Sequence, residues 1–203
     1  MNKSDVLKLI QDEYVPEYTL IKSSLFKLTD CFDLLGISIE SSAYHSRRFY
    51  IWAYWIPLYA PTEQIYFNNG SRLNGENGEL WDLDELDESK FGKQIRKPLS
   101  KWISATEKVS TRLKALRKNV RTFGTLRDYC TLFYTLTRTN DLDEARFVYE
   151  EVAAKSWRKP WQKELIGEIK SVVDLFECPK TLDEKLIENI DRSIQHLEIN
   201  RMN

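Results

Sequence analysis

The sequence has few of the residues on which most enzymatic sites are built. Two histidines, His45 and His196, occur in 203 residues, and most of the chain separates them. Neither has a cysteine or histidine at metal-ligand spacing, and CxxC and HExxH motifs are absent, so we expect no metal site. The seven glycines are scattered, without GxxxxGK[ST] or GxGxxG. We therefore expect no nucleotide-dependent chemistry and no cofactor.

Cysteine is also scarce. The three cysteines, Cys31, Cys130 and Cys178, lie far apart, and an odd, scattered set is typical of a reducing cytosol. Residues 1–14 contain acidic side chains where a signal peptide is apolar. The longest nearly apolar run, 49–60, is far below the roughly 20 residues that span a bilayer. These features predict a cytoplasmic protein with no membrane partner.

Net charge is almost absent, whereas aromatic residues are abundant. A formal charge of −1 gives no overall attraction to nucleic acid or to anionic membranes, so an electrostatic partner must be bound through a local patch. Six aromatic residues fall within 49–59, and this density suits a β-strand. The segment 47–73 is thus expected to form the sheet around which the chain is organised.

The aromatic strand is expected at 47–56. Its alternation places Phe49 and Ile51 on one side and Tyr50 and Trp52 on the other. Because both sides are apolar, the strand is either central and covered on both faces, or it leaves one face for a partner. Residues 37–40 and 64–68 are expected as neighbouring strands, which gives an antiparallel sheet of about three strands.

The remaining periodicity predicts helices. The expected N-terminal pair covers 4–14 and 16–35. The second helix is predicted because apolar residues recur every three or four positions, and Gly36 is expected to end it. The other expected helices are 98–120, 126–139, 142–154, 161–177 and 182–197. We predict an α+β fold, mostly helical, in which helices cover a small antiparallel, aromatic-rich sheet. Residues 1–90 hold the helical pair and the sheet, and 91–203 hold helical hairpins packed on them as one compact unit.

Residues 131–154 (TLFYTLTRTNDLDEARFVYEEVAA) resemble a tetratricopeptide-type hairpin. Ala145 occupies the tight helix contact, Tyr149 lies four residues later, and the turn residue Asn140 lies five residues before. The likeness covers one unit, whereas stacked arrays need roughly three. We therefore expect helical hairpins and not a repeat protein.

A second likeness is carried by PLYAP at 57–61, Gly70-x-Arg72-Leu73 and Trp81-Asp82. This middle third resembles uncharacterised small bacterial proteins of α+β build, some of which occur near polymorphic toxins. The resemblance implies an immunity-type role, and it brings no functional residues with it.

The preferred function is therefore non-enzymatic protein binding, as a bacterial immunity or antitoxin-type inhibitor of a toxin or effector. The acidic stretch 76–88 can neutralise a basic surface of such a partner. A solvated loop that pairs with the basic helix of the same chain is the simpler interpretation of this stretch. The expected partner-binding residues are Arg72, Trp81, Asp82, Asp84, Glu85 and Asp87.

Two alternatives stay open. The segment 112–127 is basic without an acidic residue, so it is either a phosphate-binding surface or the solvated end of a helix. The nucleic-acid-binding residues of this alternative are Arg112, Lys114, Arg117, Lys118 and Arg121. The second alternative is an enzyme with a site near His45, Arg47 and Arg72, although a polar entry to the aromatic strand is the preferred interpretation of the first two.

Overall fold

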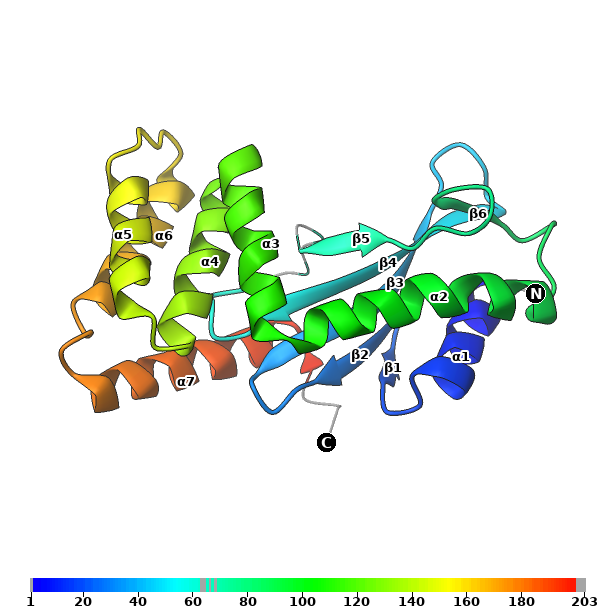
Figure 1. Cartoon of the computed structure of the whole chain (residues 1–203), viewed down its shortest axis with the longest axis horizontal. Coiled ribbons are helices and arrows are strands. Elements are labelled where there is room, and N and C mark those ends of the chain that lie inside the picture. The colour runs from blue at the N-terminus through cyan, green and yellow to red at the C-terminus, as the bar shows by residue number, and fades with distance from the viewer. Residues whose placement is uncertain (1, 63–64, 66, 68, 200–203) are drawn as a thin grey trace. The chain divides into compact units, whose positions relative to one another are not determined.

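A computed structural model of the chain describes residues 2–62, 65, 67 and 69–199 (Figure 1). Its elements are α1 (Lys3–Tyr14), β1 (Thr19–Ile21), β2 (Ser24–Leu28), β3 (Asp33–Ser41), β4 (Arg48–Pro57), β5 (Gly70–Arg72), β6 (Leu80–Asp82), α2 (Glu88–Glu107), α3 (Val109–Thr122), α4 (Leu126–Arg138), α5 (Leu142–Ala153), α6 (Pro160–Val173) and α7 (Pro179–His196). The predicted α+β class, mostly helical, is confirmed. None of the helices in this described part combines the length and apolar character needed to cross a bilayer.

The described residues form two compact units. Unit 1 takes those within 1–56 and 66–108, and therefore holds the sheet, α1 and α2. Unit 2 takes those within 57–65 and 109–201, and therefore holds α3 to α7.

The sheet of unit 1 has six strands, more than the three or so predicted. Its order is β1-β2-β3-β4-β5, and β6 also pairs with β4. β5 and β6 pair with successive stretches of β4, placing Arg72 opposite Trp52 and Trp81 opposite Phe49. The prediction of a central aromatic strand is thereby confirmed. The strand predicted at 64–68 lies outside the described residues, apart from Ile65 and Phe67, which are not in a strand.

One face of the sheet forms the core of unit 1. Phe49 and Ile51 are fully buried there, and the indole of Trp81 meets the ring of Phe91 edge to face at 5.3 Å. α1 and α2 contact each other, with the Tyr14 hydroxyl donating to the Gly92 carbonyl at 2.9 Å. The helices supply buried apolar residues to this core, namely Val6, Leu7, Ile10, Ile95 and Leu99.

The predicted helix at 16–35 is wrong, because this segment forms β1, β2 and the start of β3. The two hairpin turns have Lys22 at φ 56° and Phe32 at φ 60°, a region that glycine or asparagine usually occupies. Because neither turn has a glycine or asparagine at these positions, the sequence does not indicate a turn there. The apolar residues spaced three and four apart are spread over β1, β2, β3 and a turn, and do not form one helical stripe. Gly36 lies inside β3 and ends no helix.

The predicted long helix from Pro98 is two helices. α2 begins at Glu88, where the Asp87 side chain accepts the N–H of Lys90, and Pro98 lies inside it. Lys108 then adopts an extended conformation before α3 begins. The start was predicted at Pro98 because proline favours the first turn of a helix. α2 instead continues through Pro98, with one backbone hydrogen bond fewer.

The helical hairpins predicted for unit 2 are confirmed. α4 and α5 contact each other through a turn in which Asn140 has φ 60°, and Ala145 is fully buried. Asp141 is the residue before α5, and its side chain makes no capping hydrogen bond. Pro179 begins α7 and does not close the preceding helix.

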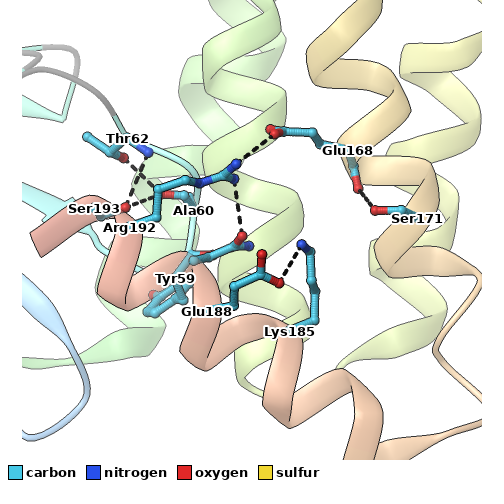
Figure 2. A network of polar contacts seen from close by, with 10 residues as sticks. Tyr59, Ala60, Thr62, Glu168, Ser171, Lys185, Glu188, Arg192 and Ser193 are labelled. Carbon is cyan, nitrogen blue, oxygen red and sulfur yellow. Dashed lines mark hydrogen bonds and ion pairs between the residues drawn. The ribbon is translucent and has the colours of Figure 1, made fainter. Parts of the chain in front are cut away.

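A polar network fixes residues 59–62 to α7 within unit 2 (Figure 2). The amide of Asn189 donates to the Tyr59 carbonyl at 3.2 Å, and the Ser193 hydroxyl donates to the Ala60 carbonyl at 3.4 Å. Arg192 joins Asn189 to Glu168 of α6, the latter at 3.2 Å. Asn189 and Ser193 are buried, so these bonds satisfy carbonyls that water cannot reach. We assign this network a structural role.

Candidate functional site

The second face of β4 is where the described residues of unit 1 leave aromatic side chains partly open. Tyr50 and Trp52 point to this face and are half-buried, whereas Phe49 and Ile51 on the opposite face are fully buried. The hydrogen bonds and ring contacts described for α1 and α2 do not involve Tyr50 or Trp52. The strand alternation that the sequence predicted therefore separates a core face from a partly open one.

Arg72 joins the open rings into a stack. It lies directly across from Trp52 in the β4–β5 register, and its guanidinium carbon is 3.9 Å from the ring centre of Tyr50 and 4.8 Å from that of Trp52. Phe67 stacks on Trp52 at 4.9 Å and meets Tyr54 edge to face at 5.0 Å. We call Tyr50, Arg72, Trp52, Phe67 and Tyr54 the Arg72 ladder.

Two glutamates hold the polar side of the ladder. Glu40, at the end of β3, accepts a 2.7 Å hydrogen bond from the indole nitrogen of Trp52 and lies 3.5 Å from an Arg72 terminal nitrogen. Glu79, just before β6, lies 3.2 Å from the other terminal nitrogen. Side chains from β3, from β4 and from the connection before β6 thus fix the plane of the Arg72 guanidinium, whose two terminal nitrogens donate in fixed directions.

The Arg72 ladder is not optimised for stability alone. The Arg72 Nε is buried and has no hydrogen-bond partner in the described residues. A buried donor without an acceptor costs about 1–3 kcal/mol. Buried polar groups without partners are rare in folded proteins and concentrate at functional sites. The unpartnered Nε therefore supports a role for the ladder beyond folding.

The other end of the ladder is fixed by buried hydroxyl groups. The Tyr54 hydroxyl lies 2.8 Å from Ser38 Oγ, which lies 2.6 Å from Ser24 Oγ. Burial raises the pKa of Tyr54 to about 12, so the phenol stays protonated and bonded at neutral pH. This end anchors the stack, and the Tyr50 end is the one open to a partner.

The predicted acidic partner-binding residues are mostly engaged with basic or backbone groups of unit 1. Asp82 lies 2.7 Å from Arg48, whose guanidinium holds the pKa of that carboxylate below its usual range. Asp84 pairs with Arg47. The Glu85 carboxylate accepts from the Asn77 amide at 3.4 Å.

The remaining two predicted partner-binding residues have structural contacts. Asp87 caps α2, as described above. Trp81 is buried, and its indole nitrogen donates to the Leu73 carbonyl at 2.8 Å. Arg72 is therefore the member of the predicted set that lies in the ladder.

The basic residues proposed for nucleic acid separate into two groups on α3. Arg112 is buried, and Arg117 makes a two-point pair with Glu144 of α5. Lys114, Lys118 and Arg121 are exposed and recur at spacings of four and three, which places them along one side of the helix. Three exposed cations fit the solvated-face interpretation as well as a phosphate contact.

The residues of the enzymatic alternative have separate partners. His45 is exposed in the β3–β4 connection, where its carbonyl accepts the Arg48 amide at 3.1 Å. Arg47 pairs with Asp84, whereas Arg72 pairs with Glu40 and Glu79. None of the described interactions brings these three side chains together.

The described ranges hold no cluster of three or more His, Cys, Asp or Glu residues suited to a metal ion. Cys31 and Cys178 are exposed, whereas Cys130 is buried, and burial raises the pKa of its thiol to about 12.

Four residues of the site went unrecognised in sequence. Tyr50 and Trp52 were expected mainly as core, and Glu40 and Glu79 were not singled out. The alternation of residues 47–56 did allow one face to be left for a partner. The pairing of Arg72 with Trp52 depends on strand register across a connection of 12 residues between β4 and β5, which local patterns do not specify.

Comparisons of the chain with protein-family models, with curated proteins and with solved structures find no match.

Proposed function

We propose that this chain is a non-enzymatic protein-binding protein that engages its partner through the Arg72 ladder. The observation that carries the proposal is the half-open stack of Tyr50, Arg72 and Trp52 on the second face of the sheet. Tyrosine, tryptophan and arginine dominate the energetic centres of protein interfaces, and the large rigid rings of tyrosine and tryptophan lose little entropy when they are buried.

Pre-organisation supports this proposal. The guanidinium of Arg72 is already held by two rings and two carboxylates, so that binding needs little further ordering of the side chain. An interface formed from fixed side chains avoids much of the entropic cost of association. The buried Tyr54 end supplies that rigidity.

The finer form of the proposal is an immunity or antitoxin-type inhibitor, which the sequence resemblance suggests. Under this form the acidic stretch contributes less than expected from sequence, because Asp82 and Asp84 are already paired with arginines. Its paired charges form a rim beside the ladder, where complementarity affects association rate more than affinity.

The test is capture of a partner by purified variants, followed by its identification and a titration of the purified pair. Trp52→Ala removes the centre of the ladder and is expected to weaken binding by at least about tenfold. Trp161→Ala is the matched control, because Trp161 is also exposed and also lies under an arginine, Arg127, at 5.6 Å in unit 2. A partner that binds Trp52→Ala and wild type equally overturns the proposal, and so does failure of any captured protein to bind saturably.

A further inference from the structure

We infer that the Arg72 ladder receives a basic side chain, arginine or lysine, from the partner protein. The inference rests on the proposed function and adds the chemistry of the partner. Its basis is the way in which charge is layered on the ladder, with the positive group more deeply placed than the negative ones.

The layering follows from the exposure of the three charged side chains. The Arg72 side chain is 31% exposed, whereas those of Glu40 and Glu79 are 47% and 52% exposed. The guanidinium side chain is thus less exposed than the two glutamate side chains that pair with it, and the group carries one more negative than positive charge. An approaching partner meets the carboxylates first, so a cationic group is attracted and an acidic one is repelled.

The carboxylates retain unused acceptor capacity. Glu40 Oε2 receives both the Trp52 indole and Arg72, and Glu79 Oε2 receives Arg72. The Oε1 atom of each glutamate accepts no hydrogen bond from the described part of the chain. Because an ionised carboxylate offers about four acceptor positions, each can take a further N–H donor without releasing Arg72.

The rings favour a cation as well. One face of the Tyr50 ring already contacts the Arg72 guanidinium at 3.9 Å, and because Tyr50 is half-buried, a second cation would stack on the exposed part of its ring. A partner arginine satisfies both requirements together, because its planar fork binds a carboxylate while its face stacks on an aromatic ring. Lysine satisfies the charge requirement and lacks the planar contact.

The test uses three short peptides that differ in one side chain: acetyl-Gly-Arg-Gly-amide, its lysine analogue and its citrulline analogue. Citrulline keeps the shape of arginine and removes the charge. Binding is followed by NMR at the indole N–H of Trp52, which is assigned by its loss in Trp52→Phe. We expect a saturable shift with arginine, with a dissociation constant on the order of millimolar, weaker binding of lysine and no shift with citrulline.

The glutamates are tested by the double variant Glu40→Gln and Glu79→Gln. Each glutamine keeps an acceptor oxygen for Trp52 or Arg72 and removes the negative charge, so arginine affinity should fall on the order of tenfold. The control is Glu76→Gln, an exposed carboxylate of the same acidic stretch that lies outside the ladder. Equal binding of citrulline and arginine, an absence of saturable arginine binding, or tighter binding of a glutamate peptide overturns the inference.

The two proposals fail in distinguishable ways. If the captured partner needs Trp52 but binds the double glutamine variant as tightly as wild type, protein binding at the ladder stands and the basic side chain is refuted. If the partner binds Trp52→Ala normally, both are refuted. Under the inference, raising the salt concentration should also weaken the arginine peptide, because part of its affinity is electrostatic.

Discussion

Gly36 of β3 lies directly beneath the ring of Tyr54 of β4. A Cβ at position 36 would stand 2.4 Å from two ring carbons, closer than any van der Waals contact allows. The ring cannot move away freely, because its hydroxyl is hydrogen-bonded to Ser38. The close approach of the Tyr54 ring therefore requires glycine at position 36. Backbone conformation does not, because the φ of Gly36 is outside the left-handed region.

We expect Gly36→Ala to lower the free energy of unfolding by about 1–3 kcal/mol, because the added methyl group overpacks the sheet. Urea unfolding followed by circular dichroism measures the change. Gly167→Ala is the matched control: no atom lies within 4 Å of its added Cβ, and a helical glycine replaced by alanine should gain up to about 1 kcal/mol. Two variants with the same sign of effect would contradict this account.

Removal of the buried Tyr54 hydroxyl should lower the free energy of unfolding, whereas removal of the buried Tyr134 hydroxyl should not. Tyr54→Phe deletes a hydrogen bond to Ser38 and should cost about 1 kcal/mol of unfolding free energy. The Tyr134 hydroxyl is buried, and no described residue lies in hydrogen-bonding geometry with it. Tyr134→Phe should therefore leave stability unchanged or raise it. Equal losses from the two variants would show that Tyr134 has a partner in solution.

Arg72→Met should separate binding from folding. Methionine keeps the apolar stem between the rings and removes the unpartnered Nε, so the free energy of unfolding should change by less than about 1 kcal/mol. Affinity for the captured partner should fall, because the donor fork is lost. Parallel urea unfolding and titration of the partner measure both effects. A large loss of stability would instead make Arg72 a structural residue.

The Arg117–Glu144 pair predicts a pH-dependent contribution to stability. Arg117 lowers the pKa of Glu144 from its ordinary value of 4.5, so the folded form binds this proton less tightly than the unfolded form. The stabilisation is complete above pH 4.5 and is lost as the pH falls through the lowered pKa of the folded state. Because the pair is about one-third exposed, we expect about 0.5–1 kcal/mol.

Glu144→Gln measures this contribution when its unfolding is compared with wild type at pH 7 and at pH 3. The difference should be present at pH 7 and should shrink at pH 3. Glu151→Gln, an exposed position on the same helix, is the control and should show no difference at either pH. A difference for Glu144→Gln that grows on acidification would contradict the assigned sign.

Asn189→Ala should destabilise unit 2, since the buried Tyr59 carbonyl loses its donor and Arg192 loses an acceptor. The expected loss is about 1–3 kcal/mol by urea unfolding. Gln195→Ala on the exposed side of α7 serves for comparison and should change stability by less than about 0.5 kcal/mol. Similar effects of the two variants would remove the structural role given to the network.

The sequence was most informative where apolar spacing coincided with local stop and start signals. α4 and α5 were predicted to within a residue, because Asn140 and Asp141 interrupt two regular stripes. The aromatic strand was equally clear, since its ring density has few other structural solutions. Both predictions depended on residues that are close together in the sequence.

Failures arose where the conformation is imposed by distant contacts. Lys22 and Phe32 adopt positive φ without glycine, so their turns depend on the sheet that forms around them. The ladder depends on the register of β4 with β5 and on the approach of Glu40 from β3. Single-residue patterns contain none of that information. Arg72 was singled out by its place just before Trp81 and the acidic stretch, and not by its contacts.

The three cysteines give the protein a ready means of double labelling. Cys31 of unit 1 and Cys178 of unit 2 are exposed, whereas the buried Cys130 thiol has a pKa of about 12 and stays protonated at neutral pH. A maleimide dye or spin label should therefore attach to one position in each unit of the natural sequence. Energy transfer or electron–electron coupling between the two labels would then report the separation of the units in solution, and any change in it when a partner binds.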